Sequence, residues 1–100
     1  MVKHLVSWKF KPEISEEQKA AVAADFEKRL LAVKEKAEGV IEVKVIAPPL
    51  PTSSVDLVLD STFESAEALA AYQVNPGHVE AVGACVKPYL TDRTCCDYEI

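Results

Sequence analysis

The chain has 100 residues, of which 49% are hydrophobic, and its formal net charge is −5. This length fits one domain, residues 1–100, with a single core, and the apolar content excludes a disordered chain. The acidic balance argues against nucleic acid as the main partner, because phosphate binding depends on a basic surface. No stretch resembles a signal peptide or reaches the length of a membrane span, which predicts a cytoplasmic protein without a membrane partner.

The cysteines are Cys85, Cys95 and Cys96, an odd number without a framework spacing, which is typical of reduced thiols. Cys95 and Cys96 would point to opposite faces of a strand, and this geometry is poor for a shared metal ion. The two histidines are too far apart for a metal-binding motif. The sequence therefore predicts no metal and no cofactor, with the thiols acting as small hydrophobic side chains.

The first predicted element is a strand over residues 2–11, VKHLVSWKFK, because apolar and polar residues alternate. The face expected to be buried carries Val2, His4, Val6, Trp8 and Phe10. Pro12 stops the strand, and SEEQ at 15–18 is a capping box that begins a helix. The apolar stripe of this helix consists of Val22, Phe26, Leu30, Val33 and Ala37, and Gly39 is its natural stop.

Two more strands are predicted at 40–47 and 55–63, joined by a proline-stiffened loop at 48–54. In the second of these strands, one face carries Val55, Leu57, Leu59, Ser61 and Phe63. Alternation assigns Asp56, Val58, Asp60 and Thr62 to the other face. The first face has the apolar character expected of a side packed under helices.

The next helix begins at the cap residue Ser65 and ends before Pro76. Asn75 then caps a short third helix with Pro76 at its first position. Val74 and Val79 stand at the positions of a hydrophobic staple, and the predicted apolar side of this helix is Val79, Val82 and Val86. Pro88 ends the helix, and residues 91–100 form the last strand.

The order strand, helix, strand, strand, helix, helix, strand predicts an α+β fold of the ferredoxin-like, split βαβ kind. Its four-stranded antiparallel sheet would carry the helices on one face. The other face would present Leu5, Val58 and Cys95 among charged residues. Pattern alone leaves two alternatives for that face, contact with water or pairing with a second copy of the chain.

Three segments resemble the stress-responsive A/B barrel domain family along nearly the whole chain: residues 2–11, the block TFESAEALAAYQVNPGHV at 62–79, and residues 86–100. The central block is the most specific of the three. The resemblance implies a homodimer whose two sheets close a dimeric α+β barrel, but it does not fix a reaction.

A plant branch of this family includes a cofactor-free polyketide cyclase in which a tyrosine and a histidine of the central block act on the substrate. Tyr72 and His78 match these two positions, and His4 matches a histidine of the first strand. The chain departs from the cyclase at Leu57, where the cyclase has a further histidine. It also departs where the cyclase has an aromatic pocket wall, with Ala23, Ala24 and Glu27. The cyclase substrate therefore does not transfer to this chain.

His78 would be the third residue of its helix, where the helix dipole disfavours a positive charge and keeps the imidazole neutral. A neutral imidazole can act as a general base, but the ring could equally bond only to the backbone of the turn. Tyr72 is either an orienting donor or a core tyrosine, and His4 is either a ligand contact or a satisfied core histidine. The Asn75-Pro76 break is what would let Tyr72 and His78 converge.

Three functional hypotheses follow. The first is a small homodimeric binding protein whose pocket, between helices and sheet, takes a partly apolar organic ligand. Its expected lining is Leu57, Leu59, Tyr72, Val79 and Val82, with His4 and His78 as polar contacts. The second is a cofactor-free cyclase, lyase or isomerase in the same pocket, with His78 as base and Tyr72 as donor. The third is a purely structural dimer.

Overall fold

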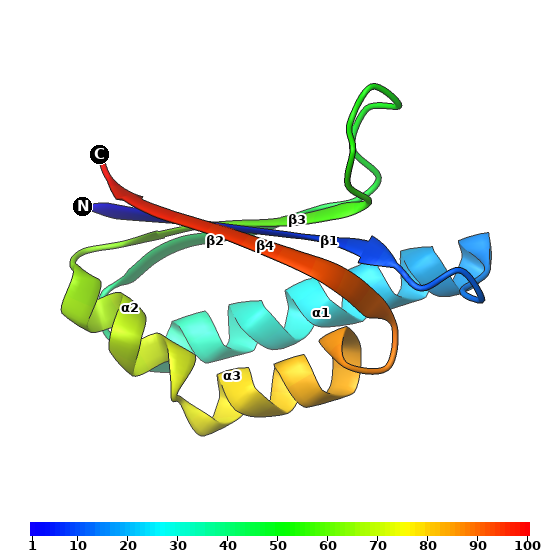
Figure 1. Ribbon diagram of the computed structural model, residues 1–100. Helices are drawn as coiled ribbons and strands as arrows, with labels where there is room; N and C mark the ends of the chain where they lie inside the picture. Colours follow the sequence, from blue (N-terminus) through cyan, green and yellow to red (C-terminus); the bar gives the residue numbers. More distant parts are fainter.

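The computed structural model describes residues 1–100, with four strands forming one layer and the helices a second layer beneath it (Figure 1). The elements in chain order are β1 (Val2–Phe10), α1 (Glu16–Lys36), β2 (Val40–Ile46), β3 (Leu57–Phe63), α2 (Ala66–Gln73), α3 (Pro76–Ala81) and β4 (Leu90–Glu99). The segment Val82–Val86 continues α3 as a π-helical turn. The predicted α+β order is thus confirmed, as is the single capping box at Ser15.

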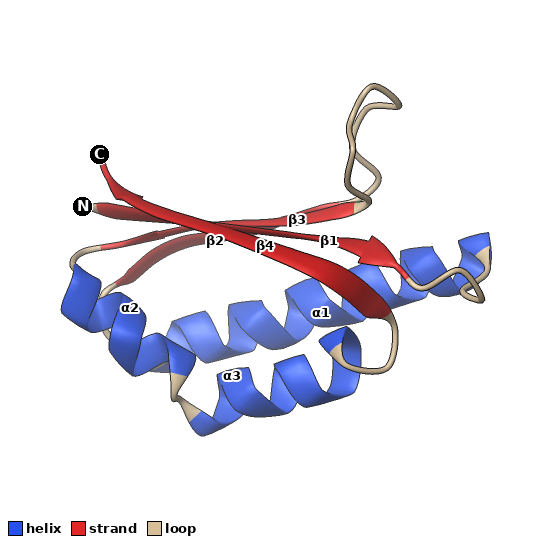
Figure 2. Cartoon of the chain, in the orientation of Figure 1, coloured by secondary structure: helices blue, strands red, loops and turns tan.

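The sheet has the order β2-β3-β1-β4, and every neighbouring pair is antiparallel. All helices cover the same face, which leaves the opposite face without any covering element (Figure 2). The first and last strands lie side by side, so the two ends of the chain meet, and the Ile100 N–H donates to the Met1 carbonyl at 3.0 Å. None of the helices combines the length and the apolar composition needed to cross a bilayer.

The core lies between the sheet and the helices, as the alternation in the strands predicts. In β1 the predicted face is buried, including His4 at 2% and Trp8 at 4% exposure. In β3 the residues Leu57, Leu59 and Phe63 are at most 2% exposed. The α1 stripe packs against them through the buried residues Val22, Phe26, Leu30 and Val33. Hydrophobic burial on this one sheet face fixes which way each strand turns its side chains.

The cross-strand register corrects one expectation about the open face. Leu5 pairs with Cys96, whereas Cys95 pairs with Val6, which is buried on the helix side. Directly paired residues share a face of the sheet, so Cys96, and not Cys95, lies on the open face with Leu5 and Val58. The sequence pattern missed this because both cysteines are exposed on an edge strand, where alternation carries no hydrophobic signal.

The helix after the proline break differs from its prediction in phase. Its buried residues are Ala81 and Cys85, while Val82 and Val86 are half-buried. The difference begins within α3 itself, where Val79 is 57% exposed and Ala81 is buried. The buried side of this segment is therefore carried by the small residues Ala81 and Cys85, four positions apart, and the larger valines do not mark it. The segment ends in a π-helical turn, in which the Lys87 N–H donates to the Val82 carbonyl at 3.2 Å.

Gly39 sits where the chain passes from α1 to β2, and its φ of 77° lies in the left-handed region. A Cβ at this position would stand 2.6 Å from the Cβ of Ala68 in α2. We expect Gly39→Ala to destabilise the fold by about 1–3 kcal/mol through backbone strain and overpacking. Urea unfolding measures this cost. Gly83→Ala is the matched control, because a Cβ there meets nothing within 4 Å and should stabilise by about 0.4–1 kcal/mol. Equal effects of both changes would contradict the argument.

Candidate functional site

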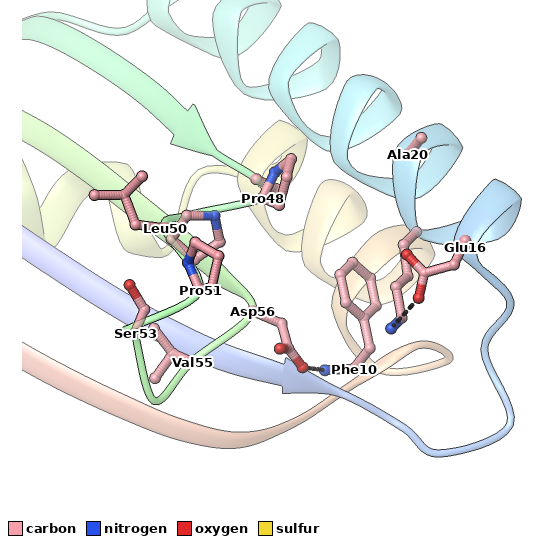
Figure 3. Close-up of a pocket in the computed structure, with 12 residues that line it drawn as sticks. Phe10, Glu16, Ala20, Pro48, Leu50, Pro51, Ser53, Val55 and Asp56 are labelled. Atoms are coloured by element: carbon pink, nitrogen blue, oxygen red, sulfur yellow. Dashed lines mark hydrogen bonds and ion pairs between the residues drawn. The ribbon is translucent and has the colours of Figure 1, made fainter.

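The two main hollows on the surface lie away from the residues singled out by the sequence. The first, about 350 Å³ in volume, is lined by Phe10, by the start of α1 and by residues of the loop between β2 and β3 (Figure 3). Its polar groups already have partners: Asp56 accepts the Phe10 N–H at 2.9 Å, and Lys19 pairs with Glu16 at 3.0 Å. The second hollow lies between α1 and α3, beside Arg29 and Lys36. Neither is lined by Tyr72 or His78.

Tyr72 and His78 are brought together by the break between α2 and α3. The side chain of Asn75 accepts the Gly77 N–H at 2.9 Å and so caps α3, with Pro76 at its first position. Gly77 lets α3 approach α1 closely, because a Cβ there would lie 2.9 Å from Cγ2 of Val33. The ring centroids of Tyr72 and His78 are then 4.6 Å apart. The break therefore brings the two rings together, as the Asn75-Pro76 signal predicts, whereas the cavity expected beside them is neither of the two main hollows.

Two polar atoms of this pair are buried without a hydrogen-bond partner, the Tyr72 hydroxyl and the His78 Nδ1. Buried polar groups are normally satisfied, and leaving one unpaired costs about 1–3 kcal/mol. Trp8 Nε1 is a further buried atom without a partner. The Trp8 ring packs in the core against Phe26, with the two ring centroids 5.8 Å apart. The Tyr72–His78 pair is distinctive because two such atoms belong to side chains in direct contact.

The environment keeps both side chains of the pair uncharged. The pKa of His78 lies below its ordinary value of 6.5, chiefly because burial disfavours the imidazolium. The positive charge of Arg93 lowers it further, while the backbone of Gln73 acts in the opposite direction. Burial raises the pKa of Tyr72 to about 12, so its hydroxyl keeps its proton. The pair thus offers one proton acceptor and one hydroxyl donor at neutral pH.

His4 lies on β1 at the far end of an aromatic row. The Phe63 ring lies between it and Tyr72, with centroids 6.2 Å from His4 and 5.1 Å from Tyr72. The Nδ1 atom of His4 is not free to contact Tyr72 or His78, because its N–H donates to the Asp97 carboxylate on β4. Cys95 Sγ lies 3.9 Å from the same nitrogen. The alternative of a satisfied core histidine is therefore the one that the contacts of Nδ1 favour.

The remaining expected pocket residues divide into three kinds. Leu57 and Leu59 are fully buried on the helix side of β3, as expected. Val82 follows His78 by one helical turn, bonds its N–H to the His78 carbonyl, and is half-buried. Val79 corrects the prediction: it is 57% exposed, because the next position along a helix turns about 100° away from His78. Val74 is also 75% exposed, so the valine pair at the break does not line a cavity.

Sequence reasoning missed two residues of this region, Phe63 as the ring that links His4 to Tyr72, and Asp97 as the partner of His4. The alternation of apolar residues indicates Phe63 only as a core residue. Asp97 is separated from His4 by 93 positions, so no local pattern indicates the contact. The signal that could have found it is the pairing of the first and last strands, which a split βαβ fold requires.

Comparison with known proteins adds the wider context. The profile of the stress responsive A/B barrel domain matches residues 2–100. No curated protein matched the sequence. Among solved structures, a dimeric protein of unknown function with a ferredoxin-like fold from Bacteroides fragilis is 27% identical, with 99% of this chain and 95% of that chain covered and a TM-score of 0.88.

Two plant structures share the fold at lower identity. A protein of Arabidopsis thaliana is 23% identical, with 100% of this chain and 95% of that chain covered and a TM-score of 0.77. The hydroxynitrile lyase of Passiflora edulis is 20% identical, with coverages of 99% and 92% and a TM-score of 0.75. At these identities the similarity concerns the fold alone.

Proposed function

This chain belongs to the stress responsive A/B barrel domain family, and from that premise we propose that it is a homodimer that binds a small, partly apolar organic molecule against Tyr72 and His78. The observation that carries the proposal is the pair of buried atoms without partners, Tyr72 Oη and His78 Nδ1. A ligand with one polar group could accept from the hydroxyl and donate to the neutral nitrogen. Buried aromatic and aliphatic neighbours, Phe63 above all, suit an apolar body on that ligand.

The dimer is supported by the uncovered face of the sheet. Leu5, Val58 and Cys96 form its apolar centre, and nearby charges are already paired within the chain, Lys3 with Asp60 at 2.8 Å. The loop between β2 and β3 rises beyond this face, away from the helices (Figure 1), and its residue Leu50 is 75% exposed. A second copy placed on the same face would cover both features. The Bacteroides fragilis and other similar structures are described as dimeric.

Ligand binding can be tested with a matched pair of probes, 3-methylphenol and toluene. They have similar apolar bodies, but only the phenol can both donate to His78 and accept from Tyr72. We expect saturable amide NMR shifts near residues 72–78 with the phenol and weaker ones with toluene. Tyr72→Phe should weaken phenol binding by about 2–12-fold, the loss of one hydrogen bond of 0.5–1.5 kcal/mol. Equal binding of both probes, unchanged by Tyr72→Phe, would contradict a polar site here.

The stability of the same variants separates a binding role from a structural role. Tyr72→Phe should leave the free energy of unfolding unchanged or raise it by about 1 kcal/mol, because it removes an unsatisfied buried hydroxyl. His78→Ala should cost little, because water can enter the space of the half-buried ring. Thermal melts at one protein concentration measure both. A loss of about 1–3 kcal/mol on His78→Ala would instead indicate a histidine that holds buried backbone.

A second candidate function is cofactor-free proton transfer, favoured by the lowered pKa of His78. A neutral imidazole beside a protonated phenol can take a proton from a substrate hydroxyl and return it to the leaving group. One protein with this fold is a hydroxynitrile lyase. In such a cleavage the base removes the hydroxyl proton, the carbon–carbon bond breaks, a carbonyl forms, and cyanide leaves and is then protonated.

This second candidate is tested with mandelonitrile, whose cleavage releases absorbing benzaldehyde. We expect turnover that His78→Ala abolishes and Val74→Ala, on the outer surface, leaves intact. The rate should stay at its plateau as pH falls through 6.5, since His78 titrates below that ordinary value. A rate equal to the uncatalysed background would leave binding without turnover, and the absence of both would favour the purely structural dimer.

A further inference from the structure

A second group of chemically active side chains lies outside the Tyr72–His78 pair, where β1 meets the edge strand β4. It consists of His4, Cys95 and Asp97, which together form the only set of three close metal-ligating side chains in the structure. Their ligand atoms all lie within 4.8 Å of one another. We infer that these three residues form a binding site for a divalent transition metal ion of the zinc type, with one coordination position left open.

The sheet register places the three donors on one face. His4 is directly opposite Asp97, and Val6 is opposite Cys95, so both β4 residues share the helix side with His4. Cys95 Sγ is 3.9 Å from His4 Nδ1 and 3.6 Å from Asp97 Oδ1. Donor atoms around tetrahedral zinc are roughly 3.3–3.7 Å apart, given bonds of about 2.0–2.3 Å. Two of the three distances between donor atoms are therefore close to those required by tetrahedral zinc.

The third pair of donor atoms, His4 Nδ1 and Asp97 Oδ1, is joined by a hydrogen bond in this structure. An entering metal ion would take the place of the shared Nδ1 proton, which leaves to solvent, and the two groups would separate slightly. The Cys95 thiol would also release its proton to solvent as it binds the ion. The resulting thiolate and the Asp97 carboxylate bring two negative charges, so the site with a divalent ion would be neutral. A set of nitrogen, sulfur and oxygen donors suits zinc, cobalt or nickel better than magnesium or calcium, which prefer oxygen alone.

The surroundings hold one ligand firmly and leave the other two accessible. His4 is 2% exposed, its ring packs edge-on to Phe63 at 6.2 Å, and its carbonyl accepts from Ser61 Oγ at 3.2 Å. Cys95 and Asp97 are exposed, so the ion can enter from solvent along the edge strand. Three protein ligands with an accessible fourth position are typical of zinc sites that bind water or a further molecule.

This inference departs from the sequence expectation that no metal is bound. That expectation rested on Cys95 and Cys96 pointing apart, which they do, and on the spacing of the histidines. The fold instead supplies ligands from opposite ends of the chain. The inference does not rest on the proposed function, because none of the three residues is Tyr72 or His78.

Cobalt(II) is the probe of choice, because a thiolate bound to it gives a charge-transfer band in the near ultraviolet. The full-length protein, kept reduced and free of chelator, should bind one Co²⁺ per chain with this band, and Zn²⁺ should displace it. Cys95→Ser should remove the band. Asp97→Asn should weaken binding by more than the roughly 10–100-fold known for outer-shell partners of metal sites. Circular dichroism checks that each variant is folded.

Cys96→Ser is the matched control, because Cys96 is the adjacent exposed thiol on the opposite face of the sheet. It should bind Co²⁺ like the parent, as should Tyr72→Phe and His78→Ala. No band at saturating Co²⁺ would overturn the inference. A band that survives Cys95→Ser and disappears with Cys96→Ser would also overturn it, because the metal would then sit on the open face.

Discussion

Val58→Asp is expected to convert the proposed dimer into monomers. Val58 lies on β3 at the centre of the open face, opposite Ser7, and Asp60, two residues further along the same strand, already places a carboxylate on that side. A buried charge without a partner costs about 3–5 kcal/mol, and two-fold symmetry introduces it twice in each dimer. Association should weaken by at least about 100-fold. Sedimentation at micromolar concentration should give twice the chain mass for the parent and the single chain mass for the variant.

Val74→Asp provides the matched control, since it makes the same substitution at a valine that is 75% exposed on the helix side. It should remain dimeric. Both variants should fold, because Val58 in the single chain is only half-buried and its aspartate can turn to water. A parent that sediments as a monomer, or a Val58→Asp variant that stays dimeric, would refute pairing through the open face.

The sequence was sufficient for most of the fold because burial has a period. Alternation in 2–11 predicted β1, and the stripe at 22, 26, 30 and 33 predicted the face of α1 that packs beneath it. Caps at Ser65 and Asn75 marked where α2 and α3 begin. Periodicity was not informative where a segment lacks one regularly repeating buried face. The edge strand β4 is exposed on both faces over most of its length, and the π turn at 82–86 interrupts the helical repeat.

The candidate site was predictable only in its local half. The seven residues from Tyr72 to His78 contain a local signal, a capped helix restart that brings the two rings together. The contact between His4 and Asp97 depends instead on pairing between the two ends of the chain. Cys95 joins it because of a register that a single residue of slip would reverse. Such contacts follow from tertiary structure, and no spacing in the sequence encodes them.

Phe63→Ala is expected to have the largest effect on stability of any single change considered for the site. Phe63 is fully buried, and its ring contacts both His4 and Tyr72. Truncating a buried phenylalanine costs about 3–5 kcal/mol, a large share of the roughly 5–15 kcal/mol that stabilises a typical domain. Urea unfolding at a fixed protein concentration measures the loss, since the stability of a dimer depends on concentration. Phe63→Leu should retain more of the stability and serves if the alanine variant does not fold.

The same change should alter His78 in a way that mere destabilisation would not. Burial is the chief cause of the lowered pKa of His78, and Tyr72 covers that ring while resting on Phe63. Removing Phe63 should let Tyr72 relax and water approach, so the pKa of His78 should rise toward 6.5. Phe10→Ala is the matched control, because Phe10 is also buried but lines the hollow near the start of α1. NMR titration of the His78 ring should show a raised pKa in the Phe63 variant alone. An unchanged pKa there, or an equal rise in both variants, would mean that the aromatic row from His4 to His78 does not set the state of the candidate base.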